Sequence, residues 1–507
     1  SDTSDTAGSD TSDTAGSDTS DTAGSDESKE FIFVLPELTS TFDSVGGSAS
    51  AAYTGNEQLS TLVAWDHSAT SDGGCEDMLT IADVRPELAE SWEFREDESL
   101  LVFNLREGVL SPFDNELTAE DVKWSFDRFK ELARPAKFFY GNISLIDTEN
   151  DPFVVIDDHT FGIKILQPGS MDVTLNVFFR LLVDDSTEAL KHATDADPWA
   201  TEWLSFNSAN FGPWHFTEDD LTGGNEITWT RNPNYFGETG NVDRLIFREV
   251  TESSTRAQLL QAGEADAAAF LSFNDYQGLA DTPAQVLPCV GPNRDLLLLN
   301  EADPRFADVR VRRAISAAID RETIVANVYL GFADPSRDGL HSRFDVGERG
   351  DQFTYDPALA RELLAEAGYP DGFDFEITLS PARPGAYAPN LAALIASQLS
   401  EVGLNVSLQE IASGSDFADK FNSGNYQAMV YNESIALPDP AYAWGLIALC
   451  EGYQNSFGYC DPMFDELQGQ VRATLPGPER DALMRIMAAH IVENPPFIYI
   501  ADNALPR

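Results

Sequence analysis

Long apolar runs, lysine and histidine are all scarce in this sequence of 507 residues. No apolar run approaches the ~20 residues that a membrane-spanning helix needs, so the sequence predicts no such helix. Only 7 of the 32 basic residues are lysines, and 85 acidic residues bring the formal net charge to −53. Because proteins neutralise the nucleic-acid backbone with lysine and arginine, this charge argues against a nucleic-acid ligand.

Metal-binding and catalytic motifs are missing as well. The six histidines are scattered, and neither a His-x-x-x-His nor a Cys-x-x-Cys spacing occurs. The sequence also lacks the Gly-x-Ser-x-Gly turn that exposes a nucleophilic serine in many hydrolases. We therefore expect no resident metal, no cofactor and no enzymatic activity.

Cysteine is rare, with four residues in the chain. Four cysteines can pair in three ways, and buried free thiols are the alternative. We favour Cys450–Cys460, which closes a short loop and would contribute about 2–3 kcal/mol on the chain-entropy account. The remaining pair would be Cys75–Cys289.

The acidic residues are spread along the whole chain and do not form blocks. Such a charge repels itself and destabilises a compact state in ordinary buffer. It becomes tolerable near 1 M salt, where the Debye length is ~3 Å. The composition therefore indicates a protein of a salt-loving organism. A role as an acidic partner of basic proteins would need acidic blocks, which are absent.

Residues 1–24 are three copies of SDTSDTAG and contain no apolar side chain larger than alanine. Such a segment cannot build a core, so we expect residues 1–28 to be disordered. As a flexible tether of about 28 residues it would span roughly 30 Å. The chain starts at Ser1 without a methionine, and we expect that a leader has been removed.

The segment from Arg85 to Lys130 carries the clearest local pattern. Leu101, Phe103 and Leu105 alternate with other residues, as in a strand with one buried face. Thr118 is a candidate N-cap for a helix whose apolar stripe contains Val122, Phe126 and Phe129. Further along, the pattern predicts alternating elements: strand 374–379, helix 389–402, strand 405–411, helix 415–422 and strand 426–431.

The run LAESWEF…VFNLREGV…ELTAEDVKWSFDR, within residues 88–128, resembles the hallmark of the family 5 extracytoplasmic solute-binding proteins. This family comprises the oligopeptide-, dipeptide- and nickel-binding receptors of ABC importers. Residues 227–237 and 306–325 resemble two further family segments, and the resemblance extends over about residues 31–504.

The resemblance implies an α/β, two-lobed periplasmic-binding-protein-like fold (type II, cluster C) with an extra inserted domain. The domains expected from it follow the order of the chain. They are the 1–28 tether, a first lobe of 29–63, 183–292 and 487–507, an inserted domain of 64–182, and an opposite lobe of 293–486. Relatives usually continue for further residues at the C-terminus, so this chain is either trimmed or lacks a strand.

Function follows from the same resemblance. Such proteins close two lobes around a solute by hinge bending, and the loaded form is recognised by a membrane permease. We expect an extracellular monomer at the outer cell surface, held by an N-terminal lipid as in relatives from salt-loving archaea. The alternative is a surface structural protein that reuses the fold for assembly and forms filaments.

Several residues are candidates for ligand contact because of where the family binds its solutes. Gly47 and Ser48 lie in a Gly/Ser loop that is expected to line the cleft, where small residues let backbone groups approach a ligand. Phe139 and Tyr140 match a segment that brings aromatic side chains toward it, although aromatics at such spacing are also typical of a core. Trp444 could stack on a ligand ring or pack in the core.

Ligand identity should be encoded after residue 431. Peptide-binding relatives have Gly-Trp there and then an Asp that pairs with the α-ammonium of the peptide. This chain has Asn432 and Glu433 at the Gly-Trp position and Ala436 in place of the Asp. Since a buried ammonium without a carboxylate is costly, Glu433 or Asp439 would have to substitute. An oligosaccharide or a nickel chelate remains the alternative ligand.

N-glycosylation sequons occur at three positions. Asn142 and Asn405 are candidate glycan sites. Asn432 would be a poor one if it faces the ligand.

Overall fold

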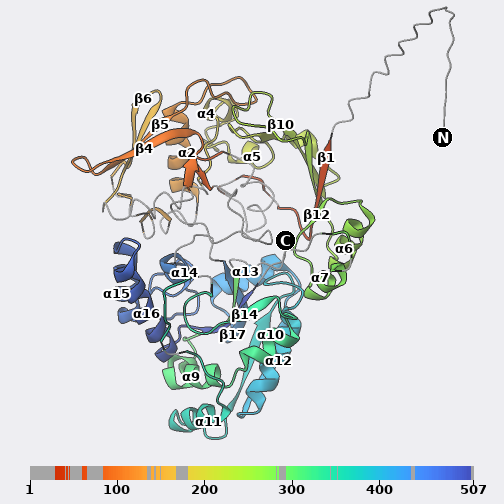
Figure 1. The fold of residues 1–507 in the computed structure, drawn as a ribbon, viewed down its shortest axis with the longest axis vertical. Helices are drawn as coiled ribbons and strands as arrows, with labels where there is room; N and C mark the ends of the chain where they lie inside the picture. The colour runs from red at the N-terminus through yellow and green to blue at the C-terminus, as the bar shows by residue number, and fades with distance from the viewer. Residues whose placement is uncertain are drawn as a thin grey trace, which may run out of the picture.

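The structure is a computed structural model. The residues that it describes are 29–39, 41–43, 45, 60–65, 84–133, 139–141, 144, 146–148, 150–166, 181–280, 282–284, 293–342, 344–350, 352–434 and 440–503. They fold into two lobes, with the N-terminal half of the chain mainly in one and the C-terminal half in the other (Figure 1). In the described residues, no helix combines the length and the apolar character needed to cross a bilayer.

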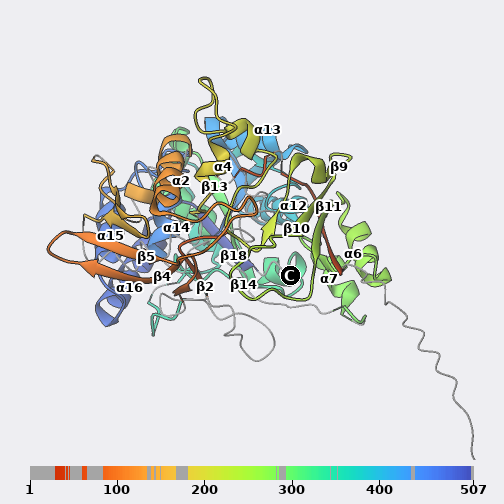
Figure 2. The same ribbon diagram turned by 90° about the horizontal axis from the view of Figure 1, so that it is seen from above.

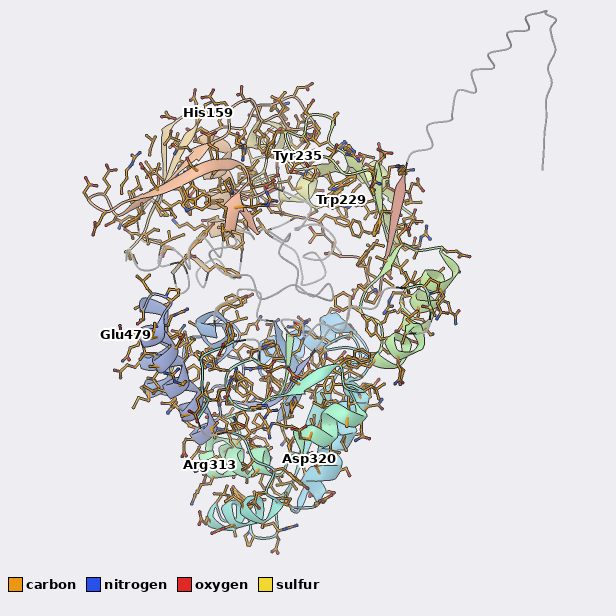
Figure 3. The ribbon with its side chains drawn as sticks, in the orientation of Figure 1. His159, Trp229, Tyr235, Arg313, Asp320 and Glu479 are labelled. Carbon is orange, nitrogen blue, oxygen red and sulfur yellow. A yellow bond between two sulfur atoms is a disulfide. The ribbon has the colours of Figure 1, made fainter. Side chains whose placement is uncertain are left out.

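The first lobe contains a six-stranded sheet in the order β12-β1-β11-β10-β8, with β9 paired to β10. Its central pair, β1 and β11, runs parallel, and β10 is antiparallel to β11. Trp229 on β10 is fully buried and packs against Phe216 and Phe247, and Figure 3 marks its place in this lobe. The strands are β1 (Glu30–Leu35), β8 (Trp214–His215), β9 (Leu221–Thr222), β10 (Glu226–Arg231), β11 (Arg244–Glu249) and β12 (Ala267–Ala268), with the short helix η6 (Glu218–Asp220) beside them.

A second, four-stranded antiparallel sheet belongs to the same lobe and has the order β4-β5-β7-β6. The helix α2 (Ala119–Leu132) covers it, and its side chains Val122 and Phe126 are fully buried. The Thr118 N–H and hydroxyl both donate to the Asp121 carboxylate, which confirms the predicted start of this helix. The other elements here are β2 (Val63–Trp65), β3 (Val84–Pro86), β4 (Ala89–Arg95), β5 (Leu100–Leu105), β6 (Phe153–Asp157), β7 (Thr160–Lys164), α4 (Ser186–Ala189) and α5 (Thr201–Leu204).

The second lobe is built on a six-stranded sheet with the order β14-β18-β13-β17-β15-β16. Strands β15, β16 and β17 are parallel, and β13 runs antiparallel to both β17 and β18. The alternating elements predicted between residues 374 and 431 are all present, with ends shifted by a few residues. The strands are β13 (Asn293–Leu299), β14 (Ala333–Pro335), β15 (Phe373–Leu379), β16 (Leu404–Glu410), β17 (Ala428–Ser434) and β18 (Ile498–Asn503).

Helices cover both faces of this sheet. One face, with Leu297 and Val430, is buried in a core that α9–α12 share; the other, with Leu296 and Tyr431, is buried in a core that includes α14–α16. Burial on both faces explains why β13 is apolar in consecutive positions. The helices are α8 (Pro304–Ala307), α9 (Val309–Ala317), α10 (Arg321–Asn327), α11 (Pro357–Glu366), α12 (Ala388–Ser400), α13 (Gly414–Ser423), α14 (Pro440–Ile447), α15 (Pro462–Ala473) and α16 (Pro478–Glu493).

Two segments that were expected in the first lobe contribute to the second. Residues 487–507 were assigned to the first lobe, but their described part, 487–503, supplies the end of α16 and the strand β18, which lies between β13 and β14. Helices α6 (Ser253–Ala262) and α7 (Phe273–Leu279) lie beside the end of the first sheet in Figures 1 and 2. The Phe273 ring nevertheless packs against Tyr329 and Tyr387 of the second lobe. Strand pairing therefore places residues 498–503 in the second lobe, and apolar packing brings α7 against it.

Candidate ligand-binding site

The second sheet has a border formed by the ends of its strands that faces the first lobe, and we call this border the strand edge. Because β15, β16, β17 and β18 run in the same direction, their carboxyl ends meet at this edge, together with the amino end of β13. Figure 1 shows α13 and α14, which follow β16 and β17, on the side of the second lobe nearest the first. In α/β proteins, ligands bind outside the carboxyl ends of the strands. This edge is therefore the candidate site.

Three charged side chains lie in a row across adjacent strands at the edge. Arg294 on β13 is directly opposite Glu433 on β17 and Asp502 on β18. Arg294 Nε donates to Asp502 Oδ1 at 2.8 Å, and Arg294 Nη1 lies 3.7 Å from Glu433 Oε1. Each of the three side chains is only 1% exposed. We call Arg294, Glu433 and Asp502 the charge triplet.

The two carboxyl groups of the charge triplet differ in their surroundings. Burial raises the pKa of Asp502, but the Arg294 guanidinium and His341 oppose it and bring that pKa down to about 2. Burial raises the pKa of Glu433 to about 7, because Arg294 only partly offsets it and Asp502 adds repulsion. Among the described residues, neither Glu433 oxygen has a hydrogen-bond donor. Asp502 thus neutralises Arg294, and Glu433 is the surplus acid.

The charge triplet also holds neighbouring segments in place. Asp502 accepts hydrogen bonds from the Ser336 hydroxyl at 2.8 Å and from the Ser342 N–H at 2.6 Å. The Gly339 carbonyl accepts from Arg294 Nη1 and from Trp444 Nε1, each at 3.0 Å. A side chain at Gly339 would have no room, since an added Cβ would lie 2.3 Å from an Ile491 methyl carbon. The strand edge and α14 are therefore fastened together.

Trp444 consequently lies in the interior. It is 1% exposed and its indole N–H is used by the Gly339 carbonyl. Of the two roles considered from the sequence, packing agrees with this geometry. Tyr140 is likewise fully buried, and its hydroxyl donates to the Phe126 carbonyl within the first lobe.

Phe139 has a different position, because its ring contacts the opposite lobe. It stacks on Tyr442 of α14 with the ring centroids 6.1 Å apart and an interplanar angle of 24°. Its other side contacts Phe129 of α2. Phe139 is thus a point of contact between the lobes beside the candidate site.

Arg383 is a residue at this edge that sequence reasoning missed. It follows the end of β15, and its half-buried guanidinium lies 4.4 Å from the centroid of the Tyr431 ring. Arg383 Nε donates to Asn432 Oδ1 at 2.9 Å and Nη2 donates to the Asn432 carbonyl at 3.3 Å. Asn432, predicted as a ligand contact, therefore orients this arginine. The signal in the sequence was an Arg-Pro-Gly turn directly after a buried parallel strand.

Of the other candidates from the sequence, one disulfide is confirmed, several positions lie outside the described residues, and one asparagine is exposed. The Cys450–Cys460 disulfide is present and joins the segment after α14 to the start of α15, as predicted. Several candidates lie outside the described residues, namely Gly47, Ser48, Cys75, Asn142, Cys289, Ala436 and Asp439. Asn405 is exposed on β16.

A second buried charge cluster lies inside the first lobe and is structural. Arg128 of α2 donates to both oxygens of Asp43, at 2.8 and 2.5 Å, and lies 3.9 Å from Asp184. Burial raises the pKa of Asp184 to about 7 in spite of Arg128. The cavity beside these groups measures about 10 Å³, enough for about one water molecule and far too small for a solute.

Within the part of the chain that the structure describes, no group of three or more His, Cys, Asp or Glu side chains could hold a metal ion.

Comparison of this sequence with known proteins identifies one family and several relatives. The family profile "Bacterial extracellular solute-binding proteins, family 5 Middle" matches residues 83–455. Heme-binding protein A of Haemophilus influenzae is 27% identical over 377 residues, covering 71% of this chain and 67% of that protein. The dipeptide-binding protein of Escherichia coli K12 is 25% identical over 448 residues, covering 83% of this chain and 82% of that protein.

Solved structures agree with the observed fold. The dipeptide-binding protein of Pseudoalteromonas sp. SM9913, in complex with Met-Leu, superposes with a TM-score of 0.79 at 22% sequence identity. The match covers 94% of each chain. The two-lobed α/β fold expected from the sequence is thereby confirmed.

Proposed function

Because the chain belongs to family 5 of the bacterial extracellular solute-binding proteins, we propose that it is the receptor of an ABC importer. It captures a peptide or a similar small molecule between its lobes and delivers it to a membrane permease. The observation that carries the proposal is the family match over residues 83–455, combined with the strand edge that faces the first lobe. The protein itself performs no chemistry on the solute.

Capture uses movement of one lobe against the other. The described contact between Phe139 and Tyr442 joins the lobes next to the candidate site. Hinge closure brings the facing surfaces of two lobes together around a ligand. A contact between the lobes such as Phe139–Tyr442 then adds to ligand affinity without touching the ligand. The charge triplet keeps the strand edge and α14 rigid, so that the second lobe moves as a unit.

Arg383 supplies the cation that an anionic group on the solute needs. A guanidinium binds a carboxylate through two parallel hydrogen bonds, and it does so best when it is already oriented. Asn432 and the Tyr431 ring provide that orientation. In a chain with a net charge of −53, a fixed positive group offsets the repulsion that neighbouring acidic side chains exert on an anionic solute at short range. The solute is therefore a carboxylate-bearing molecule, with a peptide as the first choice.

The cationic end of a peptide would need a carboxylate partner. Ala436 stands where peptide-binding relatives carry that acid, so Glu433 or Asp439 takes its place. Glu433 can serve only if the segments around it open, since it is 1% exposed and adjoins Arg294. The relatives differ in their ligands, one named for heme and another for dipeptides. An oligosaccharide or a nickel chelate is the alternative ligand.

The cellular setting completes the proposal. The receptor works as a monomer on the outer surface of a haloarchaeal cell, tethered through residues 1–28 and an N-terminal lipid. Its support is the acidic composition and the SDTSDTAG repeats. The surface structural protein considered from the sequence is not favoured, because the named relatives are binding proteins for small molecules.

The test is to identify what the protein carries. Protein purified natively in high salt is denatured, and the released molecules are identified by mass spectrometry. We expect a carboxylate-bearing solute, and we expect Arg383→Gln to retain at least tenfold less of it. Arg361→Gln is the matched control, because Arg361 is exposed on α11. A wild-type protein that releases nothing and forms polymers would contradict the receptor function.

A further inference from the structure

The outer edge of the second sheet carries a sequence motif that solute binding does not use. Strand β16 is the last strand in the order of that sheet, and in the described residues it pairs with β15 alone. Asn405, Val406 and Ser407 form an Asn-x-Ser sequon near its start. Asn405 and Ser407 are both exposed, and two residues apart on a strand they share a face.

The space around Asn405 is open and polar. A groove of about 680 Å³ runs along the amino ends of β15 and β16, and Asn405 lines it. Asn405 Nδ2 donates to Asp374 Oδ1 at 2.9 Å, so the amide nitrogen lies at the groove wall and not in the sheet. The groove is shallow and open to solvent, and it lies at the end of the strands opposite the candidate ligand site. Its lining residues are Asp374, Phe375, Glu376, Asn405, Val406, Ser407 and Gln427.

The sequon at Asn432 has the opposite character. Asn432 is half-buried on β17, a strand with neighbours on both sides, and its Oδ1 accepts from Arg383 Nε. A glycan there would displace that arginine. The sequon at Asn142 lies outside the described residues. Of the two sequon asparagines that the structure describes, Asn405 alone is exposed.

We propose that Asn405 is an N-glycosylation site and that the groove along the amino ends of β15 and β16 holds the first sugar of the glycan. The proposal rests on the proposed function in one respect, since the chain must be exported to meet a glycosylation enzyme. The donor is a glycan linked to a lipid pyrophosphate. Asn405 Nδ2 forms a bond to C1 of the sugar, the bond from C1 to the phosphate oxygen breaks, and Nδ2 loses one proton. Lipid pyrophosphate leaves, and nothing is oxidised or reduced.

The position gives the glycan a physical role. An exposed edge strand presents backbone N–H and C=O groups that can pair with a strand of another molecule. Leu408, on the same strand, is 43% exposed and would favour such pairing. A bulky, hydrated glycan on Asn405 blocks this edge. Glu376 and Ser407 line the groove with groups that can bond sugar hydroxyls.

The experiment measures glycan mass on the full chain isolated from the cell envelope of the producing organism. We expect the peptide containing Asn405 to carry a glycan, which Asn405→Gln and Ser407→Ala both abolish. Ser407→Thr keeps the sequon and should keep the glycan. Asn425→Gln is the matched control, because Asn425 is exposed on the same lobe but lies in no sequon. Sedimentation should show more self-association for the two glycan-free variants than for Ser407→Thr.

The outcomes separate this proposal from the receptor function. An exported protein with unmodified Asn405 overturns the glycosylation proposal and leaves the receptor function standing, because Asn405 lies near the amino end of β16, away from the candidate ligand site at the carboxyl ends. A protein found only inside the cell overturns both. A glycan that persists in Ser407→Ala would place the modification elsewhere and also overturn the proposal.

Discussion

Arg294 and Asp502 are 208 positions apart in the sequence but lie opposite each other on neighbouring strands, with Arg294 Nε 2.8 Å from Asp502 Oδ1. Both side chains are 1% exposed. The pair therefore ties the first and last strands of the second lobe at the edge that forms the candidate ligand site. An isolated charge at that depth would be costly to bury.

The first prediction concerns this pair. Asp502→Asn should lower the free energy of unfolding by about 3–5 kcal/mol, because it leaves Arg294 buried without its principal carboxylate. Arg294→Met with Asp502→Leu should recover much of that loss. Urea denaturation in high salt measures both. The control is the pair of exposed Arg310 and half-buried Asp308, where Arg310→Met should cost no more than about 1 kcal/mol. Equal effects at the two pairs would contradict a special role for buried charge.

The second prediction concerns Glu433 and pH. Its pKa rises from 4.5 to about 7 on folding, so the folded protein binds the proton more tightly. Stability from this group is therefore fully present below pH 4.5 and is lost as pH rises toward 7. Glu433→Gln removes the titration and mimics the protonated acid. The variant should gain stability over wild type between pH 4.5 and 7, reaching up to about 3 kcal/mol.

Denaturation at a series of pH values measures this difference. Asp184 and Glu301 also have raised pKa values of about 7. Both groups titrate in wild type and in Glu433→Gln alike, so their contributions cancel in the stability difference between the two proteins. Glu410→Gln is the control, because Glu410 is exposed at the end of β16. A difference between Glu433→Gln and wild type that stays constant with pH would show that Glu433 is already ionised in the fold.

Local elements could be predicted because their causes are local. Thr118 caps α2 through a residue three positions away, and Asp356 followed by Pro357 begins α11 in the same manner. The family resemblance then supplied the two-lobed arrangement. The short loop between Cys450 and Cys460 likewise indicated its own disulfide.

The parts that could not be predicted depend on partners far away in the chain. The sequence of β18, IYIADN, indicates a strand but not the two strands between which it lies. Arg383 became a candidate only because the end of β15 places it beside Asn432 of β17. Trp444 could not be assigned to core or ligand until the Gly339 carbonyl was found to accept its N–H.

The third prediction concerns the disulfide. Cys450→Ser with Cys460→Ser should lower the free energy of unfolding by about 2–3 kcal/mol, because the unfolded chain is no longer closed into a short loop. The helices α14 and α15 on either side should remain formed, since Gln468 of α15 also donates to the Ala441 carbonyl. The matched comparison is the double variant against oxidised wild type, because reduction of the wild type would also open the expected Cys75–Cys289 pair. An unfolding midpoint that is the same in the double variant and in oxidised wild type would contradict the expected stabilisation.

The fourth prediction concerns salt. With a net charge of −53, the free energy of unfolding should rise by several kcal/mol as KCl increases from ~0.1 M to ~1 M. The Debye length falls from ~10 Å to ~3 Å over that range, so repulsion between acidic side chains is screened. Thermal unfolding across a KCl series measures the effect. Sucrose favours the burial of protein surface but does not screen charges, so it should not reproduce the stabilisation that KCl gives. Equal stabilisation by sucrose would rule out charge repulsion as the cause.

The fifth prediction tests closure through Phe139 and Tyr442. Phe139→Ala should weaken binding of the natively bound solute about 3- to 10-fold, mainly through faster release, because an aromatic contact between the lobes is worth about 0.5–1.5 kcal/mol. Calorimetry gives the affinity and stopped-flow fluorescence gives the release rate. Tyr140→Phe is the control, since it removes a hydrogen bond to the Phe126 carbonyl inside the first lobe and should alter stability alone. Unchanged release from Phe139→Ala would mean that the stacked rings do not hold the lobes together.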